Sequence, residues 1–150
     1  CLIEGTNLSE GRGTTDPFAI IGAPFICAEG FSRAFNELGC PGVVATPVYF
    51  TPITSKHQGV LCGGIHLHIV DENILRPTEL GVRLLDLLRR MYPNDFELLK
   101  SDRPFISALA GHREFENPNW DMEELLQRYS QESEAFRQRK EKYEIYPKGK

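Results

Sequence analysis

The segment that decides the fold is Gly64-Ile65-His66-Leu67-His68-Ile69-Val70. Its side chains alternate, with Ile65, Leu67 and Ile69 on one face and the two histidines and Val70 on the other, which is the period of a β-strand. The next element, Pro77–Tyr92, has leucines at helical spacing, two arginines in its last turn and Pro93 after it, and this predicts an amphipathic helix. A strand followed by a strong helix indicates an α/β fold.

Working outward, Val43–Phe50 is rich in β-branched and aromatic residues, and Pro47 within it predicts a strand at a sheet edge or with a bulge. Apolar spacing predicts a helix over Ala28–Leu38, ended by Gly39. Four further elements are expected: a short strand at Cys1–Ile3, a brief helix opened by Asp16-Pro17 and closed by Gly22, a weaker helix over Asp102–Leu109, and a helix capped by Asp121 that runs to about Tyr143. We therefore predict one α/β domain over 1–150, with a mixed sheet covered by helices.

In the last of these helices, Met122, Leu125, Tyr129, Phe136 and Tyr143 follow one side. Glu124 is placed to complete a capping box with Asp121, and Trp120 to pack on Leu125.

Composition narrows the function classes. The chain has 41% hydrophobic and 25% charged residues, typical of a folded globular protein. Its net charge of −4 argues against nucleic acid as a partner, and no apolar run is long enough for a membrane helix. The four cysteines lack CxxC spacing, which leaves a zinc ribbon or redox motif unsupported and favours buried free thiols.

The chain begins with Cys1-Leu2-Ile3, an apolar start without Met or a signal-peptide pattern. We expect it to be a piece of a longer polypeptide, whose compartment cannot be read directly from these residues.

The most informative segment is Glu4–Thr15, which carries one apolar side chain among carboxylates, hydroxyls, an arginine and glycines. Such a segment cannot be buried without partners for its polar groups, and its glycines let a ligand approach the backbone. We interpret it as a ligand-facing loop; the alternative is a solvated surface loop. It does not match a dinucleotide fingerprint or a P-loop.

A second polar segment, Tyr49–His57, follows a strand, where α/β folds place ligand-binding loops. His57 is either a donor or proton shuttle there, or an exposed loop histidine. His66 and His68 share a strand face, but no third ligand is evident, so we expect polar packing and no metal site.

Several motifs together resemble the exo-β-N-acetylmuramidase family (NamZ/YbbC type). They are Cys1–Thr15, Pro17-Phe18, Ile21–Pro24, Pro47–Pro52, Ser55-Lys56-His57 and Leu61–Gly64, followed by the helix from Pro77. The similarity covers most of positions 1 to 93, with the motifs in the family's order. It is looser after about Leu98.

The resemblance implies the small C-terminal domain of a two-domain glycosidase that releases terminal N-acetylmuramic acid from peptidoglycan fragments during cell-wall recycling. The partner would be a Rossmann-like N-terminal domain of the same protein, absent here, which carries the catalytic glutamate; the substrate cleft would lie between the two. An extracytoplasmic location is implied, and no cofactor.

Within that expectation, Glu4 and Glu10 are candidate assisting carboxylates. Candidate contacts to the sugar are Asn7, Ser9, Arg12, Thr14, Tyr49 and His57. Arg12 is predicted to bind the lactyl carboxylate, because its planar fork matches a carboxylate; alternatively it pairs with Glu4 or Glu10 as an internal strut. The alternative for the whole loop is a non-catalytic surface that docks on a partner domain.

Overall fold

The computed structural model describes residues 1–100 and 105–146. The chain divides into two compact units, Cys1–Pro118 and Asn119–Lys150. None of the helices in the described part is long and apolar enough to cross a membrane.

The first unit is built on a three-stranded sheet of β1 (Ile20–Ala23), β2 (Val43–Phe50) and β3 (Cys62–Ile69). The order is β1-β3-β2 and both pairings are antiparallel, so the sheet is not mixed as predicted. No helix intervenes between β2 and β3 along the chain, so the chain returns beside itself without the crossover a parallel pair needs. Pro47 lies on β2, an edge strand, as its missing N–H predicts.

The centre of the sheet depends on two glycines. Gly64 is paired with Gly22 on one side and Val48 on the other. A Cβ atom at Gly64 would overlap the Ile21 carbonyl oxygen, and one at Gly63 would overlap that of Ile26. The two glycines of the Leu61–Gly64 motif are therefore explained by the close approach of β3 to β1 and to the segment that follows β1.

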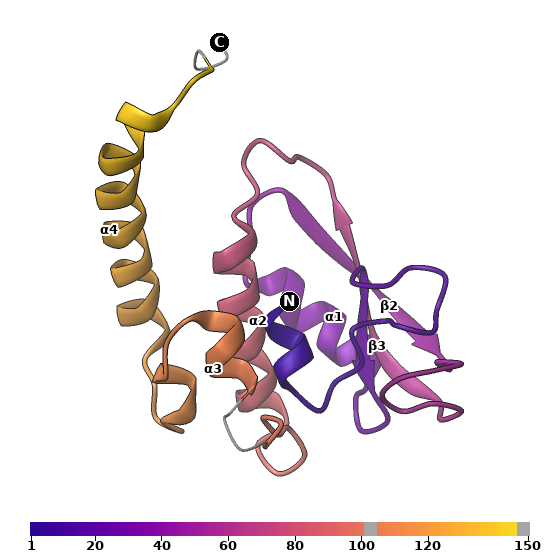
Figure 1. The fold of residues 1–150 in the computed structure, drawn as a ribbon. Helices are drawn as coiled ribbons and strands as arrows, with labels where there is room; N and C mark the ends of the chain where they lie inside the picture. Colours follow the sequence, from indigo (N-terminus) through magenta and orange to yellow (C-terminus); the bar gives the residue numbers. More distant parts are fainter. Residues whose placement is uncertain (101–104, 147–150) are drawn as a thin grey trace. The chain divides into compact units, whose positions relative to one another are not determined.

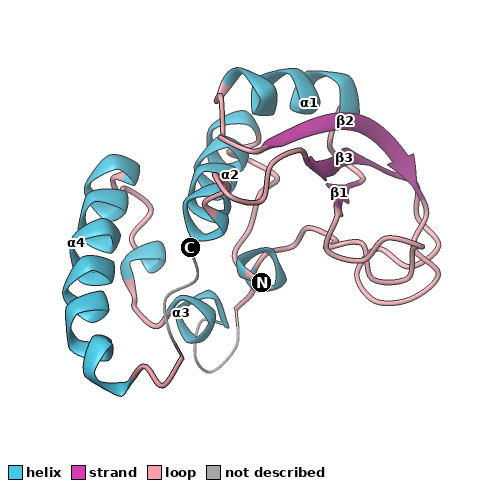
Figure 2. Cartoon of the chain, turned by 90° about the horizontal axis from the view of Figure 1, so that it is seen from above, coloured by secondary structure: helices cyan, strands magenta, loops and turns pink. Residues whose placement is uncertain are grey.

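Helix α1 (Ala28–Glu37) covers one face of the sheet (Figure 2). Its predicted apolar stripe is confirmed, with Phe31 and Phe35 fully buried. Polar side chains also join it to β2: Asn36 makes two hydrogen bonds of 2.8 Å to the backbone of Ala45, and Ser32 donates to the Ala45 carbonyl at 2.9 Å. Gly39, just past the helix, has the positive φ expected of a residue at this position.

Helix α2 (Pro77–Met91) is confirmed at its predicted position and packs on α1 (Figure 1). Its buried face consists of Val82, Leu84, Leu85, Leu87 and Leu88. Asp86 is also buried, and it accepts from Arg89 and pairs with Arg90. The first unit ends with α3 (Phe105–Ala110) and a 3₁₀ turn, η2 (Glu114–Glu116). The helix expected over Asp102–Leu109 corresponds to α3, and its first three residues lie outside the described part.

Two N-terminal predictions are wrong. Cys1–Ile3 is not a strand, because Leu2–Gly5 forms a 3₁₀ turn, η1, that packs on α2 and α3. The brief helix from Asp16 to Gly22 is absent as well. The Asp16 carbonyl does accept from Ala19 and Ile20, but Phe18 has a φ of 68°, and Ile20–Ala23 pairs with β3. The turn therefore leads into a strand.

The second unit consists of α4 (Met122–Lys140) and η3 (Glu141–Tyr143). The predicted cap is confirmed: the Asp121 carboxylate accepts from the Glu124 amide at 2.8 Å. Trp120 and Leu125, predicted to pack together, are both buried. Farther along the predicted apolar side, Phe136 and Tyr143 are exposed.

Candidate functional site

The loop Glu4–Thr15 is more deeply embedded than a surface loop. Thr6, Leu8, Ser9 and Glu10 are all buried. Backbone hydrogen bonds hold the loop on both sides, because Ser9 exchanges two with Gly22 of β1, and the Asn7 amide donates to the Glu97 carbonyl at 2.9 Å. The alternative of a solvated surface loop is therefore not what the structure shows.

The organising group of the loop is the ammonium of Lys56. It donates to four carbonyl oxygens in turn along the loop, those of Ile3 at 3.2 Å, Glu4 at 3.3 Å, Thr6 at 2.9 Å and Leu8 at 2.7 Å. Its fifth neighbour is Oε2 of Glu10, at 2.8 Å.

Glu10 links this ammonium to Arg12. The Glu10 carboxylate is only 2% exposed, and its second oxygen, Oε1, accepts from Arg12 Nη1 at 3.0 Å. The other terminal nitrogen of Arg12 donates to Glu4 Oε2, also at 3.0 Å. Two carboxylates and two cations thus balance within one network, which is what burial of Glu10 in ionised form requires.

Arg12 forms the outer end of this network. Its side chain is 45% exposed, and the guanidinium lies over the Phe18 ring, 5.1 Å from the ring centroid. The hydrogen bond to Glu4 is the main reason that the pKa of Arg12 is raised above its ordinary value. The internal strut considered from the sequence is present, with both glutamates as partners. The carboxylate-binding role of Arg12 stays a prediction.

The other loop candidates use their polar atoms within the protein. Asn7 donates to the Asp95 carbonyl at 2.7 Å and accepts from the Glu97 amide at 3.0 Å. The Ser9 hydroxyl accepts from the Gly11 amide, and the Thr14 hydroxyl donates to the Gly11 carbonyl. These three side chains set the shape of the loop, and their contact with a sugar stays a prediction.

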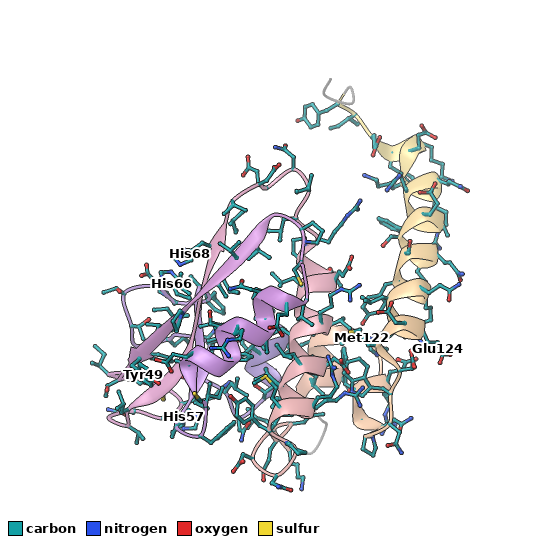
Figure 3. The ribbon with its side chains drawn as sticks, turned by 180° about the vertical axis from the view of Figure 1, so that it is seen from behind. Tyr49, His57, His66, His68, Met122 and Glu124 are labelled. Carbon is teal, nitrogen blue, oxygen red and sulfur yellow. The ribbon has the colours of Figure 1, made fainter. Side chains whose placement is uncertain are left out.

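The structure brings His57 to the loop and places Tyr49 elsewhere. His57 Nε2 lies 2.6 Å from the Asn7 carbonyl, and the residue has a φ of 58°. Tyr49 donates to Glu29 Oε2 at 2.8 Å, which raises the pKa of its phenol and lowers the pKa of that carboxyl group. Figure 3 labels both side chains.

His66 and His68 lie next to each other on β3, with ring centroids 4.4 Å apart (Figure 3). His68 Nε2 is 2.8 Å from the Thr46 hydroxyl. Over residues 1–100 and 105–146, no three His, Cys, Asp or Glu side chains gather closely enough to hold a metal ion. The four cysteines are free, as predicted, but only Cys62 is buried; Cys1 and Cys27 are exposed.

Exposed apolar side chains accompany the loop. Ile53 donates its amide to the Gly13 carbonyl at 2.9 Å, and Phe18 donates its amide to the Glu10 carbonyl at 2.7 Å; both side chains are exposed. Val60 and Leu61, farther along the chain, are exposed as well. A shallow hollow lies elsewhere, between Cys40-Pro41 and the start of α2, and none of the predicted site residues lines it.

Sequence reasoning did not single out Lys56 as a site residue. The residue was present in the Ser55-Lys56-His57 motif. Its role depends on five oxygens some 50 positions away in the chain, and residue spacing does not reveal such a contact.

Comparison with known proteins identifies the family of the chain. Residues 1–146 match the family described as "Exo-beta-N-acetylmuramidase NamZ, C-terminal". The chain is 39% identical over 149 residues to the peptidoglycan β-N-acetylmuramidase NamZ of Bacillus subtilis (strain 168), covering 97% of this chain and 35% of that protein.

Two crystal structures of DUF1343 family proteins from Bacteroides fragilis NCTC 9343 share the fold. One superimposes with a TM-score of 0.84 at 24% identity over 97% of this chain, and the other with 0.57 at 26% identity over 99%. The chain covers 40% and 39% of their lengths. On the extent of these matches, the chain belongs to the family of NamZ-type exo-β-N-acetylmuramidase C-terminal domains.

Proposed function

We propose that this chain supplies one wall of the substrate cleft in a longer glycosidase that releases non-reducing terminal N-acetylmuramic acid from peptidoglycan fragments. The rest of the protein would include a Rossmann-like domain with the principal catalytic residue. The chain spans 35% of the length of the curated relative it matches, which leaves room for such a domain. A role in cell-wall recycling and an extracytoplasmic location belong to the same proposal.

The observation that carries the proposal is the position of Arg12. A guanidinium has five N–H donors, and Glu4 and Glu10 each engage one of its two terminal nitrogens. The rest of the side chain is substantially exposed. N-acetylmuramic acid differs from N-acetylglucosamine by a lactyl ether that bears a carboxylate. Arg12 is a partly exposed cation held in place by its two glutamate partners, and a guanidinium N–H donor that they leave unused is suited to hydrogen-bond that group.

Glu4 and Glu10 are weaker candidates for chemistry. A general acid must hold and release a proton near the glycosidic oxygen, so its carboxyl group has to face the substrate. Glu10 is instead buried between two cations, and Glu4 is paired with one. We assign both to the support of Arg12.

The second candidate function is docking on a partner domain without contact to the sugar. It is favoured by the exposed apolar side chains of Phe18, whose ring lies against Arg12, and Ile53, whose amide bonds to Gly13, because apolar side chains exposed at a surface are suited to a protein contact.

The test is an assay of the longer protein with chromogenic β-glycosides of N-acetylmuramic acid and of N-acetylglucosamine. We expect hydrolysis of the first and much weaker hydrolysis of the second, with the difference reduced by Arg12→Ala. Arg33→Ala, on the exposed side of α1, is the matched control. The opposing result is a preference for the muramic acid glycoside that Arg12→Ala leaves intact, while Ile53→Ser weakens binding of this domain to the remaining part of the protein. That result would replace the substrate-wall function with the docking function.

A further inference from the structure

We infer that Lys56 is a positioning residue, whose ammonium acts as an internal cation that fixes the Ile3–Glu10 segment and thereby holds Arg12 in place. This inference rests on the proposed function for its substrate readout, but the structural part can be tested without a substrate.

The Lys56 ammonium has more oxygen neighbours than N–H donors. An ammonium has three N–H donors. In this structure five oxygens, four carbonyls and one carboxylate, lie between 2.7 and 3.3 Å from Nζ. The three donors are therefore shared among the five oxygens. We call these oxygens, from Ile3, Glu4, Thr6, Leu8 and Glu10, the cage; it binds a compact positive charge. Four carbonyl oxygens that point toward one position repel one another unless a cation occupies that position.

The ammonium and the groups that it binds are largely shielded from water. The Lys56 side chain is 21% exposed, and the carboxylate it meets, that of Glu10, is almost inaccessible to solvent. Thr6 and Leu8, whose carbonyls it binds, are fully buried. Water therefore has little access to replace the ammonium, so the loop depends on this side chain for its shape.

Glu10 and Glu4 connect the cage to Arg12. Lys56 holds Oε2 of Glu10, and Oε1 of the same carboxylate receives Arg12. The Glu4 carbonyl is in the cage, and the Glu4 side chain receives the other terminal nitrogen of Arg12. Both anchors of the guanidinium are thus fixed by one ammonium, and Lys56 acts on Arg12 through them.

The structural test uses the 150-residue chain with Lys56→Met, which keeps an apolar stem and removes the charge. We expect faster amide exchange at Asn7, Ser9 and Gly11, whose N–H groups bond within the loop or to its neighbours, with exchange in β2 and β3 unchanged. Lys140→Met is the control, because Lys140 pairs with a single carboxylate, that of Glu144, on the surface of α4. Unchanged exchange in the loop of Lys56→Met would overturn the inference.

The rescue test asks whether the charge is what matters. Lys56→Ala removes the atoms that propylammonium would replace, and 1-propanol is its uncharged counterpart. We expect propylammonium, and not propanol, to restore the loop's slow exchange and its folding where that is lost. Lys56→Arg should not restore it, since a planar guanidinium does not fit a cage built for a compact ammonium. Equal rescue by propanol would show a space-filling role and overturn the inference.

The functional test uses the longer protein and the muramic acid glycoside. Because Lys56 would not touch the sugar, Lys56→Met should raise KM by roughly tenfold to a hundredfold, the size of one lost charge-assisted bond, with kcat little changed. A roughly tenfold to hundredfold fall in kcat with KM unchanged would contradict a role of Lys56 in positioning Arg12. If the wild-type protein does not hydrolyse the glycoside at all, the proposed function fails, and the exchange and rescue tests still decide the role of Lys56.

Discussion

Arg12 is both an internal strut of the loop and the candidate for substrate recognition, and a single substitution can separate the two roles. In the longer protein, Arg12→Lys should weaken selection for muramic acid over its lactyl-free analogue by roughly tenfold to a hundredfold, since a lysine cannot bind a carboxylate bidentately. The measurement is the ratio of kcat/KM for the two glycosides, with Arg33→Lys as the control. If both substrates weaken by the same factor, Arg12 is a strut only.

Glu10 is the residue whose loss should cost the most stability in the loop. Glu10→Gln would leave Lys56 and Arg12 without their shared buried carboxylate. Because both cations are partly exposed, we expect the lower end of the usual cost of breaking a buried pair, about 3 kcal/mol in the free energy of unfolding.

Glu4→Gln is the matched control for that change, because Glu4 is more exposed than Glu10 and has one cationic side-chain partner in the described structure. Its expected cost is about 1 kcal/mol or less. Urea denaturation of the three proteins measures the difference. An equal cost for both variants would mean that the network does not depend on the buried carboxylate.

The sequence indicated that the loop Glu4–Thr15 needs polar partners, but not which groups supply them. A polar, glycine-rich segment needs partners wherever it is buried, so the need of Glu4–Thr15 for internal hydrogen bonds followed from composition alone. The partners themselves did not: Asn7 bonds to residues 95 and 97, and Lys56 to residues 3 to 10. Such contacts between distant positions depend on how the elements pack.

Among the elements, the β1–β3 pair depends most directly on single residues. Gly64→Ala should reduce the free energy of unfolding by about 1–3 kcal/mol or more, because its Cβ would overlap a β1 carbonyl and force the strands apart. Gly30→Ala, in α1, is the control. A Cβ there meets nothing closer than 3.7 Å, and a helical Gly-to-Ala change should stabilise by about 0.5–1 kcal/mol. Thermal melting distinguishes the two, and a tolerated Gly64→Ala would contradict the close-approach argument.

The start of α4 gives a second prediction about an element. Asp121→Ala should cost about 1 kcal/mol, the usual effect of losing an N-cap, and leave substrate binding by the longer protein unchanged. Asp121→Asn, which keeps a capping oxygen, should be close to wild type. A strong binding defect at an unaltered melting temperature would show that Asp121 has a functional role instead.

The elements also show which patterns are decisive. Helices α1 and α2 were predicted correctly because their apolar residues repeat over two or more turns and their ends are marked by Gly39 and Pro93. Short segments gave no such signal. Ile20–Ala23 is four residues long, and its pairing with β3 outweighs the local preference of Asp16-Pro17 for a helix start.

For the whole molecule, the family resemblance was confirmed, while local patterns gave the sheet only in part. Alternation located β3 and Pro47 placed β2 at an edge, but neither fixes strand direction. The antiparallel pairing of β2 with β3 follows from their connection, which contains no helical crossover. The residue pattern of either strand alone does not reveal this direction.

The last prediction concerns what this chain does alone. We expect the 150-residue chain to show no turnover of the muramic acid glycoside. Hydrolysis of a glycosidic bond normally needs an acid and a second carboxylate on opposite sides of that bond, about 5–9.5 Å apart. The two carboxylates of the loop instead converge on the same guanidinium, so they cannot flank a sugar while that network is intact.

The measurement is release of the chromophore by the purified chain beside the longer protein at equal concentration, with Glu4→Gln and Glu10→Gln made in both. The longer protein should retain chemistry in Glu4→Gln, with any loss appearing mainly in KM, because that glutamate supports Arg12 and does not transfer a proton. Turnover by the isolated chain that disappears in a variant whose melting temperature shows it still folded would reverse this assignment and make that glutamate a catalytic residue.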